Sequence, residues 1–174
     1  MLYSDYFNSF MDYTVVPGGS AHYKKIAAEL NRIAKKSRRF GYIFSTAAKL
    51  CEALEIKYEL GVKTRAAYAA GDLSTLRDLA KRDYVEAEKR INAFALAFEK
   101  QWFTDNKPCG FDVQDIRIGG IIRRTSACRR RILDYVGGKI ESIPELEEEI
   151  LPYGEKNMPG YFNQSKHYLT TNVF

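Results

Sequence analysis

The feature that most constrains this chain is the helical spacing of its apolar residues. In four long stretches they recur every three or four positions. No alternation of apolar and polar residues is long enough to predict a strand, and no segment repeats. Because an amphipathic helix is stable when its apolar stripe is buried, this spacing predicts helices that pack together. We therefore predict an all-α fold, an antiparallel bundle of about four to five helices.

The expected elements follow from the stretches and the breaks between them. An irregular, aromatic strap is expected over residues 1–19, a helical bundle over 20–151 and an irregular tail over 152–174, all in one domain spanning 1–174. Helices are expected over about 20–37, 40–70, 73–102 with a bend at Asp83-Tyr84, and 113–136, and a short acidic helix from Pro144. Ser20 and Asp112 are expected to cap helices, because their oxygens can accept free backbone N–H groups.

Length and composition exclude several classes of protein. The 174 residues are 45% hydrophobic and 28% charged, which is ordinary for a globular chain and excludes a disordered one. Its apolar runs fall far short of the roughly 20 residues that cross a bilayer, so no membrane partner is expected. The first residues, Met1 to Asp5, lack the pattern of a secretory signal, which favours the cytoplasm.

The residue types that usually carry chemistry are sparse. Three cysteines, Cys51, Cys109 and Cys128, show no Cys-x-x-Cys spacing, and Cys51 and Cys128 fit apolar helical faces. The two histidines, His22 and His167, have no metal-ligand spacing. Phosphate-binding glycine loops and a nucleophile elbow are also missing. The sequence therefore predicts no catalytic residue, no metal site and no cofactor.

Positive charge suggests one alternative function. The segment from Asp115 to Lys139 contains seven basic and two acidic residues, a net charge of +5 that equals the formal net charge of the chain. Arginines pair with phosphates, so a basic helical module that binds nucleic acid is a possible interpretation. The spacing favours solvated helix flanks instead, which the acidic run from Glu145 to Glu149 could partly neutralise.

A glycine pair, Gly119-Gly120, lies inside the predicted fourth helix. Each glycine costs about 1 kcal/mol relative to alanine in a helix interior. Either another backbone or a ligand approaches closely at this point, or the helix kinks there.

Several motifs together carry a family resemblance. They are Gln101-Trp102-Phe103, Asn106-Lys107-Pro108 and the run from Gly110 to Gly120, with weaker matches over residues 20–23, 48–51, 57–61, 135–140 and 145–148. The chain resembles the C-terminal helical domain of a bacterial subgroup of family 20 glycoside hydrolases, the β-N-acetylhexosaminidases. The likeness spans nearly the whole chain, and its most specific block is Asp112 to Gly120.

The resemblance implies that the active site lies elsewhere. Members of this subgroup have a (β/α)8 barrel with an adjacent Asp-Glu pair, which performs substrate-assisted retaining hydrolysis of terminal N-acetylhexosamine. No Asp-Glu dipeptide occurs in this sequence, and a barrel needs about 250 residues. We therefore expect a fragment of a longer enzyme, a non-catalytic accessory and dimerisation domain. Its expected partners are the catalytic barrel domain of the same polypeptide and a second copy in a homodimer.

The resemblance also implies a contact surface for the barrel. Candidate interdomain or active-site-rim residues are Trp102, Asp112, Asp115, Arg117, Gly119 and Gly120. For Trp102, the alternative is that this single tryptophan caps the core of the bundle.

Overall fold

The computed structural model describes residues 1–9 and 11–149, and over these residues it contains helices and no strand. Its elements are η1 (Asp12–Thr14), α1 (Gly19–Lys36), η2 (Arg38–Phe40), α2 (Gly41–Lys57), α3 (Leu60–Ala69), α4 (Leu73–Asp78), the π-helical turn η3 (Leu79–Asp83), α5 (Tyr84–Asp105), α6 (Phe111–Val136) and α7 (Pro144–Glu147). The all-α prediction is confirmed. The predicted tail over 152–174 lies outside the described residues.

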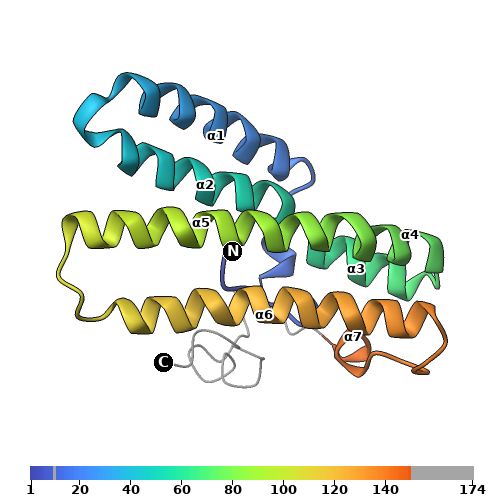
Figure 1. Ribbon diagram of the computed structural model, residues 1–174. Coiled ribbons are helices and arrows are strands. Elements are labelled where there is room, and N and C mark those ends of the chain that lie inside the picture. The colour runs from blue at the N-terminus through green and yellow to red at the C-terminus, as the bar shows by residue number, and fades with distance from the viewer. Residues whose placement is uncertain (10, 150–174) are drawn as a thin grey trace, which may run out of the picture.

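The long helices pack side by side with alternating direction (Figure 1). Helices α5 and α6 form an antiparallel pair, α2 packs on α5, and α1 packs on α2 as the outermost helix. The short helices α3 and α4 lie near the junction of α5 with η3, at the opposite end from the α5–α6 turn. This arrangement leaves α1 covered mainly on the side that faces α2.

The predicted helix over 40–70 is wrong in one respect, because it is interrupted at Tyr58-Glu59 and forms α2 and α3. The break lets the Glu59 carboxylate accept hydrogen bonds from the backbone N–H groups of Gly18, at 2.9 Å, and Ser20, at 3.4 Å. Glu59 therefore serves the start of α1. Ser20 is not the cap that we predicted. The N-cap residue of α1 is Gly18, with a φ of 83°, and it has no side chain that could accept a hydrogen bond.

Of the other predicted helix boundaries, some are confirmed and others are wrong. The break at Gly71-Asp72 is confirmed, and Asp72 caps α4 by accepting from the Thr75 backbone N–H at 2.9 Å. Near the bend expected at Asp83, the backbone forms the π-helical turn η3 and then continues as α5. Asp112 does not cap α6, because the N-cap residue is Gly110, with φ of 88°. Asp112 instead lies in the first turn, where its charge meets the positive end of the helix dipole.

The N-terminal strap, whose dense aromatic residues predict a packed segment, forms part of the core. Tyr6 and Phe7 are among the most buried side chains, and they pack in the larger of two apolar clusters with α3, α4, α5 and α6. The hydroxyl of Tyr6 lies 2.8 Å from that of Thr125 on α6. A Cβ atom on Gly61 would lie 2.9 Å from the Tyr6 carbonyl oxygen, so glycine lets the strap cross α3 closely.

Charged groups hold the strap in place as well. Arg124 donates two hydrogen bonds to the buried Asp5 carboxylate, at 2.6 and 2.9 Å, and the backbone N–H groups of Phe7 and Asn8 donate to the same carboxylate. Burial raises the pKa of Asp5, but these bonds outweigh it and keep the pKa below its usual range. The buried ammonium of Lys57 donates to the Ser4 carbonyl oxygen. The strap is thus tied to both α2 and α6.

The cysteines are free thiols in three environments. Cys128 is buried in the larger cluster, as predicted, while Cys51 is half-buried and Cys109 is exposed.

Within the described part of the chain, none of the helices has the length and apolar character needed to span a bilayer.

Candidate interdomain face

An aromatic cluster closes the turn between α5 and α6. The ring of Trp102 lies 5.9 Å from that of Phe98 and 6.0 Å from that of Phe111, and Phe111 also packs against Phe103. The indole N–H of Trp102 donates to the Lys107 carbonyl oxygen at 3.0 Å. Trp102 is therefore half-buried with its donor satisfied inside the chain, which favours the interpretation that it caps the end of the bundle.

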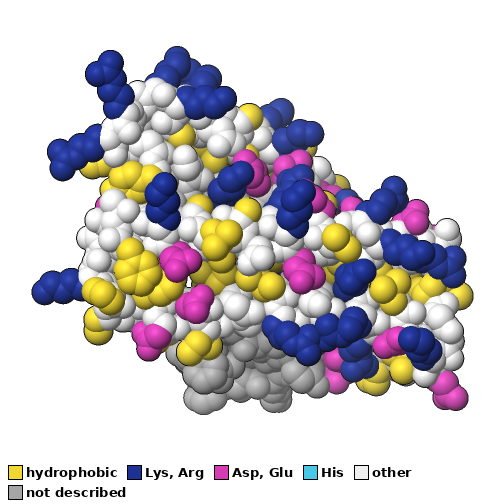
Figure 2. Space-filling model, viewed as in Figure 1, with side chains coloured by type: hydrophobic (Ala, Val, Ile, Leu, Met, Phe, Trp, Pro, Cys, Tyr) yellow, Lys and Arg dark blue, Asp and Glu magenta, His cyan; other side chains and the backbone are white. Residues whose placement is uncertain are grey.

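Beside this cluster, the first half of α6 presents an outward surface, which we name the α6 face. Its residues are Asp112, Val113, Asp115, Ile116 and Gly119. All five are exposed, and their spacing places them on one side of the helix, opposite the buried Ile118 and Ile121. Ile116 exposes 65% of its surface, an unusual value for a large apolar residue. Figure 2 shows apolar and acidic side chains gathered at the end of the molecule where α5 meets α6.

The remaining candidate residues lie at the edge of this face. Arg117 is half-buried, and its guanidinium lies 4.4 Å from the centre of the Tyr3 ring, so it helps to hold the strap. Gly120 is half-buried. Of the six residues expected to form a contact surface, the structure thus brings Asp112, Asp115 and Gly119 together on the outward side, with Trp102 half-buried in the neighbouring aromatic cluster.

The glycine pair does not interrupt α6, which is continuous from Phe111 to Val136. A Cβ atom on Gly119 would meet no atom within 4 Å, so no described part of this chain approaches closely there. Gly119 therefore destabilises α6 relative to alanine, although no contact within the described chain requires a glycine at this position. The sequence could not show that the space beside Gly119 is open, because that depends on which side of α6 is covered.

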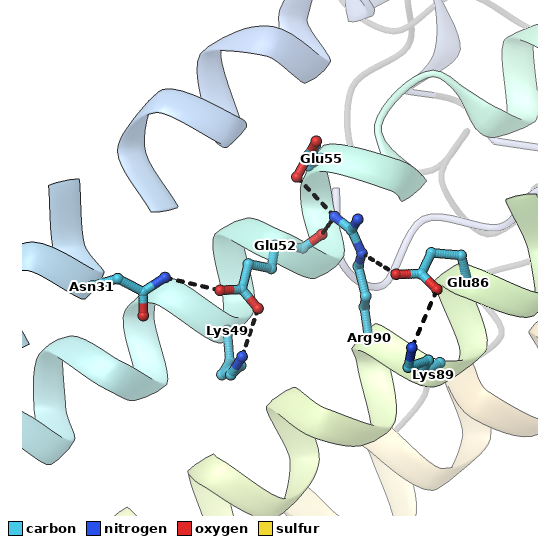
Figure 3. Close-up of polar contacts among 7 residues, drawn as sticks. All are labelled: Asn31, Lys49, Glu52, Glu55, Glu86, Lys89 and Arg90. Carbon is cyan, nitrogen blue, oxygen red and sulfur yellow. Dashed lines mark hydrogen bonds and ion pairs between the residues drawn. The ribbon is translucent and has the colours of Figure 1, made fainter. Parts of the chain in front are cut away.

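A separate network of charges joins α1, α2 and α5 (Figure 3). Glu52 accepts from Asn31 at 2.9 Å and from Lys49 at 2.7 Å, while Arg90 contacts both Glu55 and Glu86 at 2.7 Å. These contacts link three helices across their shared interface.

The network favours ionised carboxylates. Burial raises the pKa of Glu52, but its hydrogen bonds with Lys49 and Asn31 lower it further than burial raises it. The bond from Arg90 lowers the pKa of Glu86. A general acid needs the opposite shift, so this cluster suits the cohesion of the bundle rather than proton donation.

The arginines of α6 largely serve the fold. Arg124 pairs with Asp5, Arg129 donates to the Ala80 carbonyl oxygen at 3.1 Å, and Arg131 pairs with Glu145 at 3.1 Å. The predicted neutralisation by the acidic run is thus seen at Glu145. These contacts engage Arg124, Arg129 and Arg131, while Arg123 and Arg130 are exposed.

A charge count over another window would have found a larger basic segment. Residues 19–40 contain seven basic residues and one acidic residue, a net charge of +6, which exceeds the net charge of +5 from Asp115 to Lys139. Elsewhere, an open cavity of about 320 Å³ has Lys24, Lys63, Glu55 and Asp83 in its lining, a mixture of charges that favours no particular ligand. No group of three or more potential metal-ligating residues occurs among the residues that the structure describes.

Comparison with known proteins identifies one family. The model of the family described as the glycoside hydrolase 20C C-terminal domain matches residues 1–164. No curated protein sequence matches the chain.

Proposed function

The chain belongs to the glycoside hydrolase 20C C-terminal domain family, and we propose that it is the non-catalytic accessory domain of a β-N-acetylhexosaminidase. In this proposal a barrel domain of the same polypeptide removes terminal N-acetylhexosamine by substrate-assisted hydrolysis. The helical domain contributes by contact with that barrel and by assembly of a homodimer. We place the enzyme in the bacterial cytoplasm.

One observation carries the assignment of the contact surface to the α6 face. Ile116 is largely exposed beside Gly119, where an approaching backbone would find open space. Burial of a side chain like Ile116 against a partner contributes on the order of 1–2 kcal/mol, and a glycine permits the close packing that such burial needs. The acids Asp112 and Asp115 flank this apolar centre, as polar residues do at the rim of an interface.

The experiment adds bulk or charge to this face in the enzyme that contains both domains. Gly119→Leu fills the open space, and Ile116→Asp places a charge at the apolar centre. Val85→Asp is the matched control, because Val85 is also exposed but lies at the beginning of α5, far along the helix from the α5–α6 turn. We expect the two face variants to weaken the association between the domains and to reduce turnover of a nitrophenyl N-acetylglucosaminide.

Association is measured between separately produced barrel and helical domains by calorimetry. Circular dichroism of each helical-domain variant establishes that it folds. If both face variants fold and retain the wild-type affinity and turnover, the α6 face is not part of the interface with the barrel.

The non-catalytic assignment has its own test. The isolated chain is incubated with the same nitrophenyl substrate, and no release of nitrophenol is expected. Turnover that survives purification to homogeneity would contradict the assignment.

A further inference from the structure

The most basic surface of the described chain lies on α1 and η2. Its seven basic residues are all exposed, and we name them the α1 ridge: Lys24, Lys25, Arg32, Lys35, Lys36, Arg38 and Arg39. The one acidic residue in this segment, Glu29, pairs with Arg32 at 2.6 Å. Figure 2 shows the resulting row of basic side chains along the edge of the molecule that α1 forms.

The fold keeps the ridge pointed outward. The apolar side of α1, including the buried Ala27, faces α2, and the basic side lies opposite. Between Lys24 and Lys36 the helix rises by about 18 Å, at about 1.5 Å per residue. The ridge is therefore a long and narrow array of cations, most of them on α1, which Figure 1 shows as the outermost helix.

Most of this charge is not neutralised within the chain. Among the described residues, no ion pair involves Lys24, Lys25, Lys35 or Lys36. On α6, by contrast, Arg124 and Arg131 are paired with Asp5 and Glu145. The α1 ridge is thus the described surface best suited to an anionic partner.

The shape and chemistry of the ridge narrow the class of that partner. A basic helix that inserts into a membrane needs its apolar face free, and here that face is packed on α2. Neutral sugars are usually held by flat, exposed aromatic side chains. Beside the ridge, Tyr23 packs against Tyr58 with ring centres 5.4 Å apart, and Phe40 is exposed at one end. A linear array of cations fits a linear chain of anions.

We propose that the α1 ridge binds an anionic oligosaccharide that has entered the cytoplasm, one whose sugars carry carboxylate or sulfate groups. The choice of an oligosaccharide over nucleic acid rests on the proposed function, since the family is one of glycoside hydrolases. The ridge would hold an acidic glycan chain near the enzyme that trims its terminal hexosamine.

The test uses a fluorescein-labelled chondroitin sulfate oligosaccharide and the complete chain, with fluorescence anisotropy as the readout. We expect saturable binding at low ionic strength that weakens as salt is added, because exposed charge pairs are screened. Neutral chitohexaose should not compete. The ridge variant replaces Lys24, Lys25, Lys35 and Lys36 with Gln.

A matched control variant replaces four exposed cations elsewhere, Lys81, Lys100, Lys107 and Arg123, with Gln, so that both variants lose the same net charge. If each exposed contact contributes about twofold, the ridge variant should bind at least about tenfold more weakly, and the control variant should bind nearly as the wild type does. Circular dichroism establishes that both variants fold.

Three outcomes would overturn the proposal: no binding at low ionic strength, equal losses in the two variants, or tighter binding of a labelled DNA duplex than of the oligosaccharide. The last outcome would assign the ridge to nucleic acid. None of them bears on the association of the barrel with the α6 face, so failure here is distinguishable from failure of the proposed function.

Discussion

Replacing Gly119 with alanine should stabilise the isolated chain. The residue lies in the interior of α6, and a Cβ atom there would meet no atom within 4 Å, so the substitution creates no clash and buries no new surface. What remains is the backbone preference, because alanine is more favourable than glycine in a helix interior by about 0.8–1.0 kcal/mol. For a chain of this size, that corresponds to a rise in melting temperature of about 2–4 °C.

The measurement is thermal unfolding followed by circular dichroism, with Gly61→Ala as the matched comparison. At Gly61 the new Cβ atom would lie 2.9 Å from the Tyr6 carbonyl oxygen, so the same substitution must displace the strap. Overpacking of this kind typically costs about 1–3 kcal/mol, and the melting temperature should fall.

The two variants therefore separate helix preference from packing. A lower melting temperature for Gly119→Ala would refute the reasoning, because it would mean that the space beside Gly119 is occupied or that α6 is not regular there. Equal shifts in the two variants would refute it as well.

Further predictions concern the strap and the thiols. Asp5→Asn leaves Arg124 without its partner and should lower the free energy of unfolding by about 3–5 kcal/mol in urea titrations. This loss should begin to shrink as the pH falls below about 3.8, where Asp5 of the unfolded chain binds a proton, and should disappear only below the lowered pKa of Asp5 in the folded chain. Burial raises the pKa of Asp12 to about 6, so the ionised form of this carboxyl opposes folding. Asp12→Asn should therefore raise the free energy of unfolding by at most about 2–3 kcal/mol at pH 7, and by much less at pH 4, where the carboxyl of the folded chain is protonated. An effect of the same size at both pH values would contradict this prediction. Iodoacetamide should alkylate Cys109 in the native chain, while the buried Cys128, whose pKa is raised by burial, should react only on unfolding, as mass spectrometry of labelled peptides can establish.

Much of the secondary structure was predictable because helices are encoded locally. The spacing of apolar residues identified the helices that became α1, α5 and α6, and Gly71-Asp72 marked a break that the structure confirms. The family resemblance is also confirmed by the match over residues 1–164. The helix ends were less predictable, because Glu59 reaches from a distant part of the chain to serve the start of α1.

The candidate site was predictable only in part. Periodicity and the motifs pointed to the first half of α6, and the exposure of Asp112, Asp115 and Gly119 agrees with a surface role for that segment. Trp102 lies instead in the aromatic cluster at the end of the bundle. Tryptophan has a large apolar ring and a polar N–H group, so it can lie in a core or on a surface. The neighbouring residues in the folded chain decide which of the two occurs.

By itself, the sequence determined that this chain forms helices, because the apolar period of a helix depends on residues only three or four positions apart. Only the tertiary structure decided which sides of those helices remain open. Asp5 meets Arg124 across 119 positions of the chain, and Tyr6 enters a core built from α3, α4, α5 and α6. The period marks where an apolar stripe lies, but the packing of distant segments decides what covers it, and so leaves the α1 ridge and the α6 face exposed.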